Sequence, residues 1–337
     1  MKQSMFIKIY IIPSLILSPL FSISCNSWFS IWMSMEFNMM TFIPLLNFIN
    51  KFNKELTMKY FIIQTISSSI LILSSNSIFL KLNNNNIINM LMIFLNLSLL
   101  LKMGAAPFHL WFINMMNNLN WMNCMILSTW QKIIPMMTLM YLINSKLIFL
   151  SIICSTLTGS IFGMNQESLR LILSYSSINH ISWMLMNLMI SEYMWMLYFI
   201  TYSFSNISIM WIFYKMKIFY INQMFLLNNN YLIKYHLLIN FFSISGLPPM
   251  FGFLIKWLTL SLNLWITPSL ILFIMILFSV ITFTFYMRIC INMLNNYSLN
   301  NKLMLINKFP QPKKSFLMMM MMISLSLNLW IMSMWMF

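Results

Sequence analysis

The stretch MLMIFLNLSLLLKMGAAPFHLWF, residues 90–112, decides the fold class of this chain. It is apolar over roughly the 20 residues that an α-helix needs to cross a bilayer. Within it, Lys102 stands directly before two helix-breaking residues, Gly104 and Pro107. A lysine at the centre of a membrane helix costs about 2.5–3.5 kcal/mol on insertion scales. The stretch therefore predicts a membrane helix whose ion needs a functional explanation.

Two further lysines lie in the same setting. Lys132 is in WMNCMILSTWQKIIPMMTLMYLI (121–143), three residues before Pro135, and Lys256 is in SGLPPMFGFLIKW (245–257). Proline frees backbone carbonyls, which at membrane depth must bond to protein or to water in a cavity. An ammonium group or a hydrated cavity beside such a break would satisfy them, and ion-coupled transporters commonly use broken helices.

The three lysines are candidate proton carriers, because an amine held away from water can alternate between its charged and neutral forms. The alternative is that each amine extends to the lipid headgroups from near a helix end. That alternative weighs more for Lys102 and Lys256 than for Lys132, which lies deepest in its segment.

Glu36 is the one acid expected inside the membrane. It lies near the middle of the apolar segment 26–50, whereas Glu55 lies among loop lysines and Glu167 and Glu192 lie near predicted helix starts. We expect Glu36 to pair with a lysine of another helix; a protonated, hydrogen-bonded structural acid is the alternative.

The histidines are weaker candidates. His109 follows Pro107, and His180 lies among hydroxyl residues in SYSSINHISWM (174–184). Histidine titrates near neutrality and suits proton shuttling, but a structural polar contact explains either residue equally well. His236, beside Lys234, is expected to be structural.

Composition places the whole chain in the membrane. Of its 337 residues, 61% are hydrophobic and 7% are charged, against roughly 25% charged in soluble domains. The net charge of +15 does not indicate a nucleic-acid partner, because the basic residues are scattered singly between apolar runs. The template of about 20 residues predicts about eleven spans, at approximately 4–22, 26–48, 59–80, 87–105, 122–143, 147–164, 171–189, 192–214, 236–257, 264–288 and 316–336.

The basic residues also predict the topology. If alternate loops share a side, the side of the N-terminus receives fourteen basic residues: Lys2, Lys8, Lys51, Lys54, Lys59, Arg170, Lys215, Lys217, Lys234, Arg288, Lys302, Lys308, Lys313 and Lys314. The other side receives two, Lys81 and Lys146. The positive-inside rule then predicts an odd number of spans, with the N-terminus on the cytoplasmic or matrix side and the C-terminus opposite.

Other chemistry finds no support in the sequence. There is no phosphate-binding glycine-rich loop, H-E-x-x-H or G-x-S-x-G motif. The cysteines at 25, 124, 154 and 290 are far apart, without the close spacing of metal or cluster ligands. We therefore expect no metal, cofactor or redox centre in this chain.

Four strings carry a family resemblance: KMGAAPFHLW (102–111), STWQKIIP (128–135), SYSSINHISWM (174–184) and SGLPPMFGFLIKW (245–257). In this order they resemble the chain 2 family of mitochondrial NADH:ubiquinone oxidoreductase, respiratory complex I, and the likeness covers nearly the whole chain. The composition, rich in Met, Asn, Ile and Phe, looks like that of an insect mitochondrial version.

The resemblance implies an all-α, polytopic, antiporter-like subunit of the membrane arm. Two inverted bundles, each with a broken helix, would span residues 1–145 and 146–290, followed by a loop and a C-terminal helix in residues 291–337. Longer prokaryotic relatives have three additional N-terminal helices, which this sequence lacks on the predicted count.

The resemblance also assigns roles to the intramembrane ions. Glu36 matches the acid of a Glu–Lys pair and Lys102 matches its partner. Lys132 matches a lysine on the central axis of the membrane arm, and Lys256 matches the lysine of the second bundle, toward the proton exit. His109 and His180 would be accessory hydration or relay sites.

Cofactors and partners follow from the same resemblance. NADH, FMN, iron–sulfur clusters and ubiquinone would be bound elsewhere in the complex, and the isolated chain would not be catalytic. Its partners would be other membrane-arm subunits and phospholipids, including cardiolipin. It would lie in the mitochondrial inner membrane with its N-terminus in the matrix and its C-terminus in the intermembrane space.

Two rival functions stay open at this point. A free-standing cation/proton antiporter would show sodium- or potassium-driven proton exchange in liposomes, but the chain has no second intramembrane acid to bind a dehydrated cation. In a structural assembly subunit, the buried ions would only specify packing.

Overall fold

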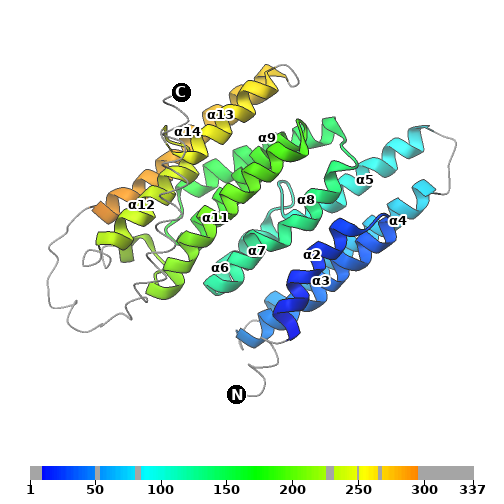
Figure 1. Ribbon diagram of the computed structural model, residues 1–337, viewed down its shortest axis with the longest axis horizontal. Coiled ribbons are helices and arrows are strands. Elements are labelled where there is room, and N and C mark those ends of the chain that lie inside the picture. Colours follow the sequence, from blue (N-terminus) through cyan, green and yellow to red (C-terminus); the bar gives the residue numbers. More distant parts are fainter. Residues whose placement is uncertain are drawn as a thin grey trace. The chain divides into compact units, whose positions relative to one another are not determined.

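The computed structural model describes residues 10–49, 54–79, 85–224, 231–248, 250–264 and 268–294 (Figure 1). These residues form helices and no strand, and a single isolated bridge joins Ser168 to Tyr220. The predicted all-α fold is therefore confirmed for the described part of the chain. The span expected at 316–336 lies outside it.

Five helices of the described part are long and apolar enough to cross a membrane: α4 (Lys54–Phe79), α5 (Asn85–Met103), α9 (Ser145–Met164), α11 (Glu192–Met216) and α14 (Ser269–Leu294). The other described helices are α2 (Ile12–Ser24), α3 (Trp28–Ile49), α6 (Leu110–Asn118), α7 (Trp121–Ser128), η2 (Trp130–Lys132), α8 (Ile133–Met140), α10 (Leu169–Leu188), α12 (Tyr231–Ser245) and α13 (Phe251–Asn263).

The chain forms two compact units, Met1–Ser151 and Ile152–Phe337. In the first unit, α3 packs between α2 and α4, and α5 packs on α4 and α8. In the second, α11 packs on α10, α12 and α13. The predicted bundles, residues 1–145 and 146–290, stay predictions.

The first break in a helix lies between α5 and α6. Gly104 takes a left-handed backbone conformation (φ +71°) and ends α5, and Leu110 begins α6 after Pro107. The indole N–H of Trp111, in α6, donates to the carbonyl of Leu101 at 3.0 Å. The sequence prediction treated residues 106–121 as a connection, so α6 corrects it: apolar residues of α6, such as Phe112 and Met116, are buried in the first unit.

The span predicted at 122–143 is interrupted at Lys132. A 3₁₀ turn, η2, separates α7 from α8. Pro135 has no N–H to donate to the carbonyl four residues earlier, at Gln131, so the α-helical ladder cannot continue through this point. The proline was visible in the sequence; the turn places Lys132 where the helix changes pitch.

The span predicted at 236–257 is two helices, which corrects the prediction of one. Ser245 ends α12, Gly246 has φ +82°, and α13 begins at Phe251. The two helices then pack closely, because a Cβ added at Gly252 would lie 1.7 Å from the carbonyl oxygen of Ser243. This close approach of the two helix ends at the break allows only glycine at position 252.

In the second unit, α10 lies in the core, since almost all of its residues are buried. Gly159 of α9 makes a close approach to it possible: a Cβ there would lie 2.8 Å from the backbone N of Asn179 and 2.8 Å from the carbonyl of Tyr175. Small residues at such crossings are typical of membrane helix packing. The arrangement buries the polar face of α10, including His180, inside the unit.

We predict that Gly252→Ala destabilises the second unit, by at least the 1–3 kcal/mol that is typical of overpacking. The new methyl group would meet backbone atoms of α12, which cannot move as a side chain can. Thermal denaturation of the purified protein in detergent should show a lower melting temperature. The matched control is Gly163→Ala, where the nearest atoms belong to the movable ring of Phe285. Equal melting temperatures for the two variants would contradict this packing.

Candidate functional site

All three lysines singled out in the sequence lie inside their units. The exposed fraction is 8% for Lys102, 1% for Lys132 and 8% for Lys256. These values argue against the alternative that the amines extend to the headgroups. Because such side chains are costly to bury without a purpose, their surroundings define the candidate site.

Lys102 lies in the last turn of α5, and its amine contacts α3. Its Nζ lies 3.3 Å from the thioether sulfur of Met35, and sulfur is a weak acceptor. Glu36 follows Met35 in the chain and is close enough for its charge to act on Lys102. Within the described residues, no direct ion pair joins the Glu36 carboxylate to the Lys102 amine. The expected pairing of Glu36 with Lys102 stays a prediction.

Glu36 itself is half-buried, on a different face of α3 from Met35. It lines an open, mostly apolar groove of about 510 Å³ between α2 and α3. Its neighbours there include Phe37 and Met40. The carboxylate therefore lies beside an apolar surface of the first unit, near the Lys102 cluster.

Lys102 and Lys132 line one small cavity of about 20 Å³. A cavity of this size can hold roughly one water molecule. The Lys132 amine lies 4.9 Å from the centre of the Phe112 ring, in α6, a cation–π distance. The polar residues that line the same cavity are Asn38, Tyr60, Gln64 and Gln131.

Two amide side chains join η2, the 3₁₀ turn that ends at Lys132, to α3. Asn38 donates to the Oε1 of Gln131 at 2.9 Å, and Gln131 donates back to the Oδ1 of Asn38 at 3.3 Å. The hydroxyl of Tyr60 lies 3.5 Å from the same Oε1 atom. Sequence reasoning missed these three residues, although an amide directly before an intramembrane lysine was a usable signal.

In the second unit, the Lys256 amine bonds to the end of α12. It donates to the carbonyl of Ser245 at 3.0 Å and to that of Ile244 at 3.4 Å, and lies 5.6 Å from the centre of the Trp183 ring. These are the carbonyls that the break at Gly246 frees. The lysine thus satisfies the broken helix, as the sequence predicted for an ammonium beside such a break.

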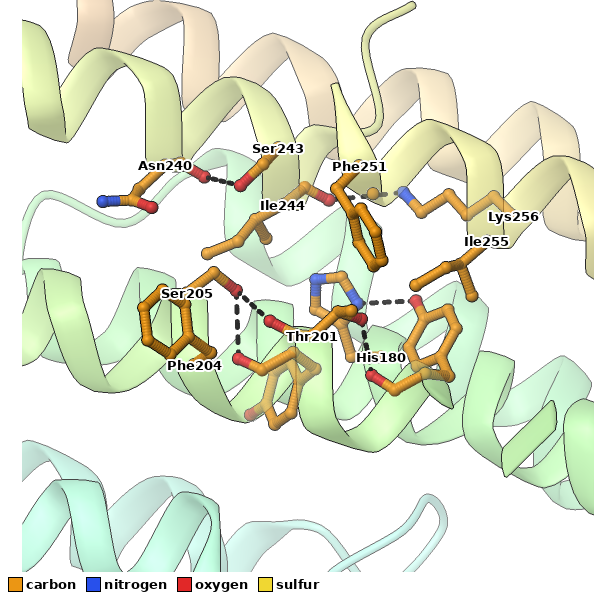
Figure 2. A pocket seen from close by; sticks show the side chains of 13 residues that line it. His180, Thr201, Phe204, Ser205, Asn240, Ser243, Ile244, Phe251, Ile255 and Lys256 are labelled. Atoms are coloured by element: carbon orange, nitrogen blue, oxygen red, sulfur yellow. Dashed lines mark hydrogen bonds between the residues drawn. The ribbon is translucent and has the colours of Figure 1, made fainter. Parts of the chain in front are cut away.

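His180 and Lys256 line one cavity of about 50 Å³ (Figure 2). The Nδ1 atom of His180 lies 2.8 Å from the hydroxyl of Tyr198, in α11. The cavity also exposes polar groups that sequence reasoning did not single out: Tyr198, Thr201, Tyr202, Ser205, Asn240 and Ser243. Its size allows a few water molecules among several polar partners.

The other histidines lie apart from these cavities. His109 is half-buried at the first break, with its Nδ1 atom 3.2 Å from the carbonyl of Pro107. His236 is buried and contacts the side-chain amide of Asn240 at 3.1 Å. The structure thus brings His180 together with Lys256 at one cavity. His109 lies seven residues after Lys102, at the far end of the break between α5 and α6.

Comparison with known proteins identifies the family. Residues 25–284 match the NADH:quinone oxidoreductase/Mrp antiporter transmembrane family. The NADH-ubiquinone oxidoreductase chain 2 of Anopheles gambiae is 41% identical, with 88% of each chain covered. The chain 2 proteins of Aedes aegypti, at 39%, and Locusta migratoria, at 37%, cover 88% and 84% of each chain.

Solved structures show the same fold. A chain of respiratory complex I from Thermus thermophilus with bound aureothin superposes with a TM-score of 0.84 at 16% identity, covering 95% of this chain and 77% of that one. A chain of the Mrp complex from Dietzia sp. DQ12-45-1b gives a TM-score of 0.75 at 12% identity, covering 83% and 59%. The polytopic membrane fold is thereby confirmed. The chain belongs to the NADH:quinone oxidoreductase/Mrp antiporter transmembrane family and, within it, to the NADH-ubiquinone oxidoreductase chain 2 proteins of insect type.

Proposed function

We propose that this chain is a core membrane-arm subunit of NADH:ubiquinone oxidoreductase, complex I, and carries protons across the mitochondrial inner membrane. The observation that carries the proposal is that each of three buried lysines lies beside a helix interruption and a small cavity with polar side chains in its wall. NADH, FMN, iron–sulfur clusters and ubiquinone belong to other subunits in this proposal. The isolated chain has no redox reaction of its own.

The first unit supplies a switch. In the described arrangement the Lys102 amine bonds to sulfur, a weak partner for a charged group. The Glu36 carboxylate is a much stronger partner and lies one residue further along α3. Movement of the amine from the Met35 face of α3 to the Glu36 face would exchange an open pair for a closed one. Charge changes elsewhere in the complex would bias this two-state element.

Lys132 responds to the switch through the cavity that it shares with Lys102. A free Lys102 ammonium repels a second positive charge nearby, and pairing with Glu36 neutralises that repulsion. Closing the pair therefore favours protonation of Lys132, and opening it favours release. The Gln131 and Asn38 amides and the Tyr60 hydroxyl provide the polar contacts along which a bound water can hand over the proton.

In the second unit, the cavity of His180 and Lys256 is the proposed proton site. The two carbonyls at the end of α12 hold the Lys256 amine at the cavity wall. They stabilise the ammonium form without neutralising it, so the proton can leave again. His180 is the accessory titratable group of this cavity.

The membrane orientation is part of the proposal, with the N-terminus in the matrix and the C-terminus in the intermembrane space. Backbone bonds from Leu169 to Phe219, at 2.9 Å, and from Ile221 to Glu167, at 3.1 Å, hold two loops together at one end of the second unit. Arg288 also bonds to the carbonyl of Gln166 there. Four basic residues thus lie near this end of the second unit, as the proposed orientation expects: Arg170, Lys215, Lys217 and Arg288.

Neighbouring membrane-arm subunits and phospholipids, including cardiolipin, are the proposed partners. The apolar residues exposed on α2, α3 and α14 fit contact with lipid or with other membrane helices. A free-standing cation/proton antiporter remains the second candidate, because the family and the Mrp neighbour include antiporter complexes. The single intramembrane acid, Glu36, disfavours it.

Lys132→Met tests the proposal directly. The methionine keeps the length of the side chain and removes its titratable amine. In purified complex reconstituted into proteoliposomes, we expect at least a tenfold loss of NADH oxidation coupled to proton pumping. Lys146→Met, at an exposed position, is the matched control and should pump as the wild type does. Full pumping by the Lys132 variant would remove this lysine from the mechanism.

The orientation has its own test in two cysteine variants, Lys215→Cys and Lys146→Cys, both at exposed helix ends. In intact inner-membrane vesicles of known sidedness, an impermeant thiol reagent should reach position 215 from the matrix side and position 146 from the opposite side. Labelling of both from one side would overturn the proposed topology.

A further inference from the structure

The hydrogen bond between His180 and Tyr198 joins two helices at the wall of the Lys256 cavity. His180, in α10, is 5% exposed, and Tyr198, in α11, is 4% exposed. The distance of 2.8 Å between Nδ1 and the hydroxyl oxygen is that of a well-formed bond. This bond fixes which nitrogen of the ring faces Tyr198.

A second tyrosine holds the same ring from another side. The centres of the His180 and Tyr202 rings are 5.0 Å apart, and Asn206 donates to the Tyr202 hydroxyl at 3.0 Å. Tyr198, Tyr202 and Asn206 follow one another at four-residue spacing, so they share a face of α11. Figure 2 shows the His180 ring between the α11 side chains and Phe251. The ring is thus held in a single orientation.

A hydroxyl group is suited to a histidine that changes its charge. When Nδ1 carries a proton, it donates to the Tyr198 oxygen, and Nε2 can take a second proton. In the resulting imidazolium, Nδ1–H still donates to the same oxygen. Adding or removing the Nε2 proton therefore requires no movement of a heavy atom. A carboxylate in place of the hydroxyl would hold the ring in its charged form, and a backbone N–H would hold it neutral.

We propose that Tyr198 is a positioning residue, which holds His180 so that protons enter and leave the ring at Nε2, inside the cavity shared with Lys256. This inference rests on the proposed function, in which His180 is an accessory relay. One N–H bond forms or breaks at Nε2 in each transfer, and the partner is Lys256 or a cavity water.

A double-mutant cycle on the assembled complex tests the proposal. The variants are Tyr198→Phe, His180→Gln and the two combined, and the readout is the initial rate of proton pumping coupled to NADH oxidation by purified, intact complex. Tyr198→Phe keeps the ring and removes the hydroxyl, and it should lower coupled pumping about fivefold, the loss expected from one buried hydrogen bond worth roughly 1 kcal/mol. In the His180→Gln background, it should cause no further loss, because both changes act through one group.

Tyr193→Phe is the matched control, since Tyr193 lies on the same helix and is 80% exposed. Wild-type pumping by Tyr198→Phe would overturn the inference, and so would an equal, independent loss in the His180→Gln background. Wild-type pumping by His180→Gln would overturn it as well. None of these results changes the outcome for Lys132→Met, so the proposed function is judged separately.

Discussion

The structure depends on one constraint: backbone carbonyls freed by a helix break inside a membrane must find a hydrogen-bond donor in the protein or in cavity water. At the break after α12, the donor is the Lys256 amine, which bonds to two carbonyls at the helix end. At the break after α5, the indole of Trp111 donates to Leu101. Without such donors, each carbonyl would be left unsatisfied away from water, at a cost of several kcal/mol. Each helix break is therefore stable only with the polar residue that bonds to its carbonyls.

This constraint explains how ions can be kept in an apolar fold. A charged lysine is costly in lipid, but a broken helix supplies carbonyl dipoles, and the gap beside it leaves space for polar side chains and water. In the described part of the chain, the partners of the three amines include a thioether, aromatic rings and carbonyls. These partners stabilise the charge without cancelling it. A lysine in this setting can give up its proton, whereas one locked to a carboxylate would keep it.

Local sequence was enough for the fold class and for the buried lysines. Apolar run length predicted the membrane helices, and the cost of burying charge pointed to Lys102, Lys132 and Lys256. It was not enough for α6, because this nine-residue helix, which begins soon after Pro107 and ends in an asparagine pair, is stabilised by packing of Phe112 and Met116. The same holds for the Asn38–Gln131 pair and the His180–Tyr198 bond, whose members are 93 and 18 residues apart. Such contacts depend on tertiary structure, which neither hydrophobic periodicity nor the spacing of motifs encodes.

The most direct test of the account is the proton-to-electron ratio of complex in which all three lysines, at 102, 132 and 256, are replaced by methionine together. Measured on purified, fully assembled complex, the ratio should fall well below that of the wild type, because every titratable amine of this subunit's path is gone. An unchanged ratio, with only the yield of assembled complex reduced, would mean that the buried charges specify packing alone and that protons cross the membrane elsewhere.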